Sequence, residues 1–265
     1  MYIEVLIKYE KEFTIGGNKD VEMKLLFSLV ALSLPVMAHA TPNTSIDSFS
    51  KAKRLLMNNV YNQNSVRRTV YCDVPFNTKK QTQLPSGFNT SLYESRAKRI
   101  EFEHIVPAEN FGRSFKEWRE GDSECVKNGK AFKGRKCATK VSKEFRLMQA
   151  DGYNLFAAVG SVNAYRSNYN FQMLSGTKSD FGSCDFHVDS RKAQPPELAR
   201  GLIARTYLYF DSTYSNFRLS KQQRQLFNVW DKQYPVSDFE CQKAEIVKSY
   251  QHNINPILEE RCATL

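Results

Sequence analysis

The sequence predicts an α+β fold that is mainly helical, a single domain stabilised by disulfides. Several stretches carry apolar residues at helical spacing, a few short stretches alternate as strands do, and six cysteines follow an apolar N-terminal segment. Hydrophobic residues make up 41% and charged residues 25% of the 265 residues, which excludes a disordered chain. No internal repeat or low-complexity linker interrupts residues 41–265, so we treat them as one domain.

The N-terminal segment predicts export. Met23 and Lys24 precede an apolar run that ends at Met37, and residues 38–40 (AHA) have the small-x-small pattern of a signal-peptidase site. We therefore expect a signal peptide at 23–40, a periplasmic or secreted protein, and no stable membrane span after cleavage. Residues 1–22 hold five acidic residues and do not resemble the start of a signal peptide. We interpret them as a mis-assigned extension, with translation starting at Met23.

The charge of the chain favours a polyanionic partner. Lys and Arg number 38 against 28 Asp and Glu, a formal charge of +10. Beyond residue 40 the counts are 34 against 23, or +11, so the basic character belongs to the mature domain. Nucleic acid and an anionic membrane surface both fit such an excess.

All six cysteines lie beyond the expected cleavage site, and an even number in an exported chain predicts three disulfides. Zinc binding is the competing interpretation. It lacks any Cys-x-x-Cys pair, and three histidines remain after processing: His104, His187 and His252. The cysteines are Cys72, Cys125, Cys137, Cys184, Cys241 and Cys262.

The N-terminal half of the domain predicts a helix and two strands. Apolar residues at helical spacing follow Ser48, a suitable N-cap, and continue to Val60. Residues 69–74 are β-branched and aromatic, which favours a short strand. Residues 100–104 (IEFEH) alternate strictly, so we expect a strand that stops before Pro107.

The rest of the domain is predicted to be mainly helical. A basic, irregular segment at 111–143 is followed by an expected helix at 155–165. A further helix starts after Pro195 and runs through Phe210. Ser220 and Gln223 suggest a capping box for another helix, which Pro235 ends. We assign aromatic residues such as Phe145 and those at 207–210 to the core rather than to base stacking.

Residues 99–108 (RIEFEHIVPA) carry the strongest chemical signal. A carboxylate next to a histidine at a strand end offers a hard oxygen ligand and a titratable base. Phosphodiester hydrolysis uses both, because a metal neutralises charge while a base activates water. By itself a Glu-His pair is common, and for an isolated pair a surface glutamate beside a structural histidine is the better explanation.

A second cluster, residues 151–171, strengthens that interpretation. Asn163 and Arg166 are three residues apart and would share one face of a helix, one holding a metal and the other a phosphate. Amide and carboxylate oxygens suit Mg²⁺, which retains several waters. For Asn168 and Asn170 a turn held by side-chain hydrogen bonds remains an equal explanation.

Five motifs in order resemble the endonuclease I family, bacterial periplasmic or secreted sugar-nonspecific nucleases. They are 101–108 (EFEHIVPA), 145–151 (FRLMQAD), 154–155 (NL), 160–171 (GSVNAYRSNYNF) and 204–209 (ARTYLY). The resemblance spans about Phe49 to Cys262. It implies a ββα-metal (His-Me finger) core, in which two strands and a helix cradle one metal ion.

The resemblance also implies a role for each matching residue. His104 corresponds to the general base that activates water, and Glu103 and Asn163 to the protein ligands of one Mg²⁺ ion, which Ca²⁺ or Mn²⁺ can replace. Arg135, in 133–137 (KGRKC), corresponds to an arginine that steadies the phosphate, although this loop differs in length from the family's. Arg166 is a second candidate for phosphate contact, because a guanidinium suits phosphate.

Two positions depart from the family pattern. Gln149 stands where the family usually carries a glutamate that helps to position metal-bound water, and Tyr153 stands where histidine is common. Glutamine keeps the shape and a carbonyl acceptor but cannot ionise. We retain Gln149 as a catalytic candidate and expect Gln149→Glu to lower the Mg²⁺ concentration needed for half-maximal cleavage. We assign no catalytic role to His187 or His252.

The resemblance implies hydrolysis of DNA, and of RNA, to 5′-phosphate ends by a monomer that contacts only the backbone. The predicted disulfides are Cys125–Cys137 and Cys241–Cys262, which close short loops and resemble family pairs, and Cys72–Cys184 by elimination among 15 connectivities. A catalytically silent, basic nucleic-acid-binding protein derived from a nuclease is the main alternative. A membrane-binding module has no amphipathic basic helix to support it.

Overall fold

A computed structural model describes residues 40–176 and 178–265, all within one compact unit that runs from Ala38 to Leu265. The expected extension at 1–22 and the signal peptide, up to residue 39, lie outside the described residues. Among the residues described, no helix has the length and apolar character needed to cross a membrane.

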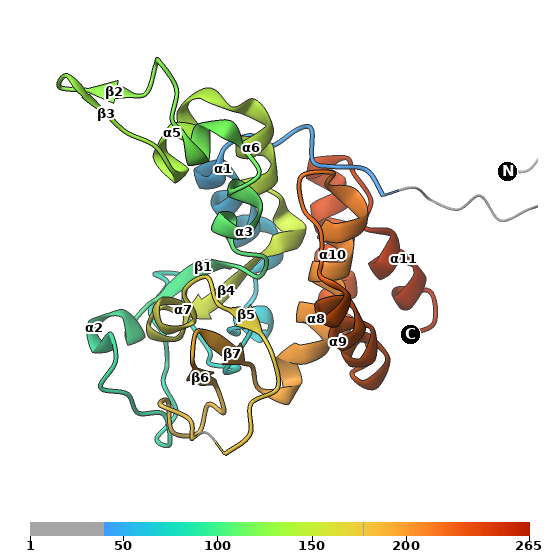
Figure 1. The fold of residues 1–265 in the computed structure, drawn as a ribbon. Coiled ribbons are helices and arrows are strands. Elements are labelled where there is room, and N and C mark those ends of the chain that lie inside the picture. The colour runs from blue at the N-terminus through green and yellow to red at the C-terminus, as the bar shows by residue number, and fades with distance from the viewer. Residues whose placement is uncertain (1–39, 177) are drawn as a thin grey trace, which may run out of the picture. The chain divides into compact units, whose positions relative to one another are not determined.

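The helices of the described part range from single turns to 17 residues. Figure 1 shows α8 to α11 gathered side by side, with α1, α3, α5 and α6 in a second group. The α-helices are α1 (Phe49–Leu55), α2 (Glu94–Ala97), α3 (Ala108–Gly112), α4 (Lys116–Arg119), α5 (Arg135–Val141), α6 (Lys143–Gln149), α7 (Gly160–Arg166), α8 (Glu197–Thr213), α9 (Lys221–Gln233), α10 (Asp238–Gln251) and α11 (Pro256–Cys262). A π-helix (Leu56–Val60) continues α1, and 3₁₀ turns cover Asn64–Val66 and Gly152–Asn154.

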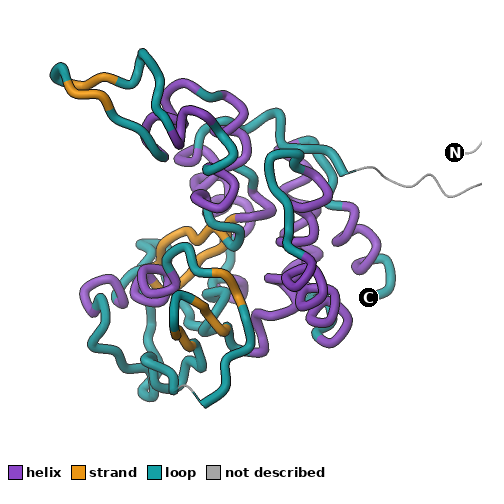
Figure 2. The backbone as a smooth tube through the Cα atoms, viewed as in Figure 1, coloured by secondary structure: helices purple, strands orange, loops and turns teal. Residues whose placement is uncertain are grey.

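The strands form three small sheets (Figure 2). Strand β1 (Ile100–His104) pairs antiparallel with β4 (Leu155–Val159), and β2 (Val126–Lys127) pairs with β3 (Lys130–Ala131) in a hairpin. In the third sheet, β7 (Lys192–Gln194) lies between β5 (Asn170–Phe171), to which it is parallel, and β6 (His187–Asp189). The mixed helical and strand content confirms the α+β class.

Helix starts follow the local sequence. Ser48 accepts a hydrogen bond from the backbone of Lys51, and Ser220 accepts one from Gln223, so both predicted N-caps are present. The helix expected from Pro195 starts at Glu197 and extends to Thr213. Helix α10 was not predicted, although Ser237 and Glu240 form a complete capping box at its start.

Two predicted elements are wrong. Residues 69–74 form a turn rather than a strand: Thr69 accepts the backbone N–H groups of Asp73 and Val74, and Asp73 has a positive φ of 50°. Residues 155–165 are not one helix, because Leu155–Val159 is strand β4 and α7 starts only at Gly160. Every residue of β4 is buried, so the alternation that marks a strand is missing from its sequence.

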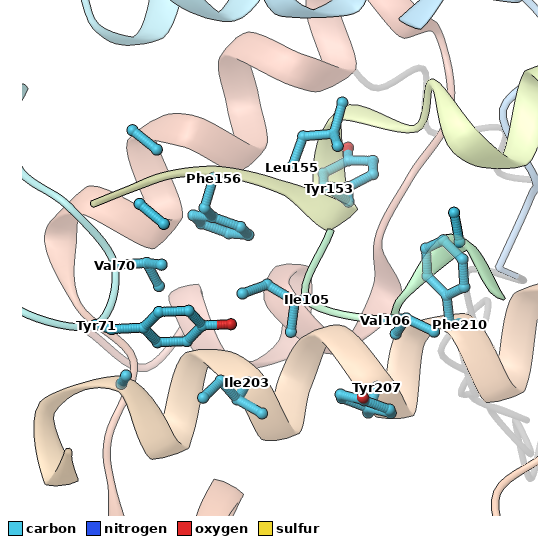
Figure 3. Close-up of a cluster of buried hydrophobic side chains, with 14 of the residues drawn as sticks. Val70, Tyr71, Ile105, Val106, Tyr153, Leu155, Phe156, Ile203, Tyr207 and Phe210 are labelled. Carbon is cyan, nitrogen blue, oxygen red and sulfur yellow. The ribbon is translucent and has the colours of Figure 1, made fainter. Parts of the chain in front are cut away.

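The core joins the helices to the β1–β4 sheet. Ile203, Tyr207 and Phe210 lie on one face of α8, at helical spacing, and are fully buried. Figure 3 shows these residues beside Ile105 and Val106, which continue the chain beyond β1. The end of β1, which carries Glu103 and His104, is therefore anchored on a packed interior, which holds these two residues in place.

Three disulfides add covalent links: Cys72–Cys184, Cys125–Cys137 and Cys241–Cys262. They are the pairs that the sequence analysis expected, and they leave no free cysteine among the described residues. The first links positions 112 residues apart and ties the turn at 69–74 to the segment before β6. Disulfide bonding, rather than zinc binding, therefore accounts for the six cysteines.

Candidate active site

Strands β1 and β4 and helix α7 form a continuous unit. Glu103 pairs with Phe156 and His104 with Leu155 across the two strands, and α7 begins directly after β4. Gly160 makes this junction possible, because a Cβ at that position would lie 2.5 Å from the carbonyl oxygen of Arg96. Two strands followed by a helix thus bring the motif at 99–108 against the motif at 160–171.

A cleft of about 320 Å³ opens along this unit. Glu103, His104, Arg135, Asn163 and Arg166, all predicted from the sequence, are among its lining residues. Gln149 does not line it. The other residues of its walls include Phe49, Trp118 and Asn168.

The His104 ring is held in one orientation. Its Nε2 lies 2.8 Å from the backbone carbonyl oxygen of Gln149, and the Phe49 ring packs on it at 4.8 Å between centroids. Burial, with a smaller contribution from the Arg135 charge, lowers the pKa of His104 to about 3. A neutral ring that donates Nε2–H to a carbonyl leaves the lone pair on Nδ1, so Nδ1 is the atom able to accept a proton.

The Glu103 carboxylate is held on one oxygen. Oε1 accepts a hydrogen bond of 2.8 Å from the Tyr71 hydroxyl and one of 2.7 Å from Arg166. Burial raises the pKa of Glu103, and the Arg166 charge and the Tyr71 hydroxyl act in the opposite direction. No hydrogen bond from another described side chain reaches Oε2. Glu103 also lines the cleft, so its carboxylate borders the space that a ligand would occupy.

Arg166 holds β1 rather than facing solvent. Its terminal nitrogens donate to Glu103, to the backbone carbonyl oxygens of His104 and Ile105, and to the Tyr207 hydroxyl. The Arg166 side chain is 0% exposed. Burial alone would lower the pKa of Arg166, but the charge of the Glu103 carboxylate keeps the pKa of Arg166 above its ordinary value. This geometry does not support the predicted phosphate contact, because the terminal nitrogens already serve protein acceptors. We assign Arg166 a positioning role instead.

Asn163 is oriented by a residue that the sequence analysis did not select. Its Nδ2 donates to Oε2 of Glu101 at 2.9 Å, which turns the amide oxygen away from Glu101. Arg96 and Arg99 pair with the same carboxylate. Burial alone would raise the pKa of Glu101, but hydrogen bonds from Arg96 and Asn163 lower it below its ordinary value. An ionised Glu101 thus holds the Asn163 amide.

Arg135 and Gln149 meet beside the cleft. Arg135 is the first residue of α5, its guanidinium carbon lies 5.3 Å from the centre of the Phe49 ring, and its Nε lies 3.3 Å from Oε1 of Gln149. Gln149 in turn donates to Oγ1 of Thr139. The side chain of Gln149 therefore supports Arg135, and its carbonyl supports His104, while a catalytic role in direct contact with substrate stays a prediction.

The two remaining histidines and the asparagines at 168 and 170 contact other parts of the chain. His187 is 2.6 Å from Asp185, and His252 caps the end of α10, both outside the cleft. Asn168 donates to Glu109, and Asn170 accepts from Asn110. Both partners belong to α3, far from the asparagines in sequence, so these bonds join two elements and are not the local side-chain hydrogen bonds of a turn.

The side-chain oxygens of Glu103 and Asn163 are of the chemical type that a divalent cation such as Mg²⁺ prefers. Carboxylate and amide oxygens are hard ligands, and Mg²⁺ rarely takes a full set of protein ligands. In the described part of the chain, no cluster of three or more His, Cys, Asp or Glu side chains is placed to hold a metal. One carboxylate and one amide would provide fewer protein ligands than such a cluster. That number is compatible with Mg²⁺, which keeps several water ligands.

Comparisons with known proteins point to one class, the endonucleases. A family model described as Endonuclease I matches residues 39–262. The chain therefore belongs to the Endonuclease I family. That match covers nearly the whole of the unit that carries the cleft.

Relatives named as deoxyribonucleases and endonucleases agree with this assignment. An extracellular deoxyribonuclease of Aeromonas hydrophila is 37% identical over 243 residues, which is 90% of this chain and 98% of the relative. A periplasmic deoxyribonuclease of the same species is 39% identical over 72% of this chain and 77% of the relative. Endonuclease-1 of Buchnera aphidicola subsp. Acyrthosiphon pisum is 33% identical over 72% and 74%.

Proposed function

We propose that the protein is an exported, Mg²⁺-dependent endonuclease that hydrolyses phosphodiester bonds of DNA, and also of RNA, with little regard to base sequence. The observation that carries the proposal is one cleft that gathers a neutral histidine with an available Nδ1, two hard oxygen ligands and a cationic guanidinium. Family membership and the deoxyribonuclease relatives support the same reaction.

His104 is the general base in this proposal. Its Nδ1 takes a proton from a water molecule as that water attacks the phosphorus, while Nε2 keeps its proton on the Gln149 carbonyl oxygen. That carbonyl stabilises the imidazolium formed in the step, as an orienting acceptor does in catalytic triads. A second water molecule donates a proton to the leaving 3′-oxygen, and the products have 5′-phosphate and 3′-hydroxyl ends.

Glu103 and Asn163 are the proposed metal ligands, in a ββα-metal arrangement of β1, β4 and α7. When bound, a divalent cation would offset the negative charge that develops on the phosphate and on the leaving group. Tyr71 and Arg166 fix Oε1 of Glu103, and Glu101 fixes the Asn163 amide. These contacts preorganise both oxygens before substrate arrives, in the way that outer residues position metal ligands.

Arg135 is the proposed phosphate contact. Two described arginines, Arg135 and Arg166, line the cleft, and Arg166 is paired with the Glu103 carboxylate. Arg135 donates to the neutral side chain of Gln149 and forms no ion pair with a described carboxylate. A permanent planar charge there stabilises the negative charge that develops on the phosphate. Since these groups address only the backbone, the net positive charge of the chain provides affinity without base recognition.

Export to the periplasm or the medium belongs to the same proposal. Extracellular and periplasmic names among the relatives, and three disulfides in this chain, favour an oxidising compartment. The protein acts as a monomer in this account.

Plasmid nicking with and without EDTA tests the proposal against the alternative of a catalytically silent binding protein. We expect open-circular and linear DNA to appear with Mg²⁺ and not with EDTA, and an RNA substrate to be cut under the same conditions. Retention of supercoiled plasmid at high protein and Mg²⁺ concentrations, together with DNA binding in a mobility-shift assay, would favour the silent binder.

A further inference from the structure

A second, larger groove lies next to the cleft. Its volume is about 680 Å³, and the basic residues on its walls are Lys53, Arg54, Arg67 and Lys80. The other residues that line it are polar or apolar: Ser50, Met57, Asn58, Tyr61, Asn62 and Thr78. No acidic residue of the described chain lines it.

The groove is built on fixed elements. Helix α1 and the π-helix that continues it form one wall. The loop at 78–80 forms the other, and the Lys80 carbonyl accepts a hydrogen bond of 2.9 Å from Ile100 at the start of β1. Arg67 braces the floor by donating to the backbone carbonyl oxygens of Tyr61 and Asn62. The groove is therefore attached to the strand that carries Glu103 and His104.

The positive charge of the walls is not neutralised by the protein. Lys53, Arg54 and Lys80 form no ion pair with any acidic side chain in the described residues. Arg54 and Lys80 are exposed, so both ammonium and guanidinium groups reach solvent at the groove. Uncompensated cations together with amide and hydroxyl groups are the partners that phosphates and sugars use.

A single side chain connects the groove to the cleft. Phe49 lines the cleft and packs on His104, and the Lys53 ammonium lies 4.5 Å from the centre of the Phe49 ring. Lys53 also lines the groove. Neighbouring phosphates of one strand advance by about 3.4 Å along the duplex axis, so a strand whose scissile phosphate is in the cleft reaches the groove within a few nucleotides.

We infer that this groove binds the phosphodiester backbone of the substrate strand on one side of the scissile bond. The inference rests on the proposed function for the identity of the ligand. It adds a binding surface outside the catalytic cleft, in which Arg54 and Lys80 contact phosphates directly and Arg67 keeps the floor in shape.

The salt dependence of DNA binding tests this inference. All proteins carry His104→Ala, so that binding is measured without cleavage, and the probe is a fluorescently labelled DNA duplex followed by anisotropy at increasing salt concentrations. Arg54→Gln/Lys80→Gln should bind more weakly and reduce the magnitude of the slope of log K against log salt by about 1.8, at about 0.9 for each lost phosphate contact.

Two matched variants complete the design. Lys221→Gln/Lys232→Gln removes the same charge from exposed positions of α9, which does not line the groove. It should lower the slope far less. Arg54→Lys/Lys80→Arg keeps the charge and should keep the slope of the parent. Equal losses in the groove and α9 variants would overturn the inference, since they would reflect net charge alone.

The outcomes separate this inference from the proposed function. A groove-specific loss of DNA binding in a protein whose unsubstituted form never cuts plasmid would support the surface and contradict the nuclease proposal. Metal-dependent cutting by the unsubstituted protein, with no groove-specific loss of binding, would support the nuclease and contradict the surface. Circular dichroism of each variant checks that the fold is retained.

Discussion

His104 owes its proposed role to three contacts that act on one ring. The Gln149 carbonyl oxygen takes the Nε2 proton, the Phe49 ring covers one face, and the nearby Arg135 charge disfavours a protonated imidazole. Each of these partners comes from a different part of the chain. The ring is therefore presented to the cleft in a single tautomer, with the basic nitrogen outward.

Replacement of His104 tests that role at the scale of one residue. His104→Ala should lower the rate of plasmid cleavage by roughly 10²–10⁴, because a general base of this kind contributes that much. DNA affinity should stay within about twofold, since the basic surface is unchanged. Parallel loss of binding and cleavage would identify His104 as a structural residue, and mobility shifts beside nicking assays measure both.

Tyr71 offers a test of how Glu103 is held. Tyr71→Phe removes the hydroxyl that donates to Oε1 and keeps the ring packed against Phe186. We expect the Mg²⁺ concentration for half-maximal cleavage to rise about tenfold, the lower end of the usual cost of losing a partner of a metal ligand. An unchanged metal requirement, with a lower melting temperature alone, would show that Tyr71 serves only the core.

Site residues that lie together in a sequence motif could be predicted from the sequence. Residues that come together only after folding could not. Glu103 and His104 are adjacent in the chain, and Asn163 falls in a second motif, so their place in one cleft could be predicted. Tyr71 could not, because 32 residues separate it from Glu103 and no pattern marks it. The burial of Arg166 could not be predicted either. The position of Arg166 near Asn163 on a helix does not show which hydrogen-bond acceptors surround its guanidinium.

At the scale of elements, the junction between β1 and β4 holds the site together. The Asn154 amide accepts the backbone N–H of Val106 at 2.7 Å and donates to its carbonyl oxygen at 2.9 Å. This buried side chain thus stands in for a missing rung of the two-stranded sheet, directly beyond His104. It explains why an asparagine is needed before the leucine in the motif at 154–155.

Asn154→Ala should therefore destabilise the fold and the site together. It leaves two buried backbone groups without partners, at about 1–3 kcal/mol for each. We expect the free energy of unfolding in urea to fall by about 2–6 kcal/mol. The exposed substitution Asn228→Ala on α9 is the control and should change it by less than about 0.5 kcal/mol. A change of similar size in both variants would contradict the bridging role.

The errors at this scale have a physical origin. The apolar run at 155–159 and the following residues have no period of two, because both faces of β4 are buried, and such a strand resembles a buried helix in sequence. Residues 69–74 have strand-like composition, yet only Val70 donates to β4, through the Ala157 carbonyl oxygen. Pairing with a distant strand, rather than local preference, decides both cases.

At the scale of the whole molecule, buried charges link the helices to the strands. Asp151 accepts hydrogen bonds from Tyr209 of α8, from Tyr214 and from Gln251 of α10. Lys243 of α10 donates to the Gly152 carbonyl oxygen at 2.6 Å and lies 3.8 Å from the centre of the Phe156 ring. The segment between α6 and β4 is therefore fixed on both helices, which supports Gln149 and His104 from behind.

Lys243 makes stability depend on pH. Burial lowers its pKa from 10.5 to about 7, so between these values the unfolded chain binds a proton that the folded protein does not. Stability should therefore rise as the pH increases from 7 toward 10, by up to about 1.4 kcal/mol per pH unit. Lys243→Met should lack this rise. Urea unfolding at pH 7.5 and 9.5 gives the comparison, and equal slopes in both proteins would show that Lys243 stays protonated.

The central claim is that Glu103 and Asn163 hold the metal and His104 supplies the base, and a Mg²⁺ titration of plasmid nicking addresses both halves. We predict that wild-type protein requires Mg²⁺ and is silent in EDTA. Asn163→Ala should raise the half-maximal Mg²⁺ concentration by about tenfold or more, whereas His104→Ala should lower the plateau without moving the midpoint. Cleavage that persists in EDTA, or a midpoint that Asn163→Ala leaves in place, would contradict the account.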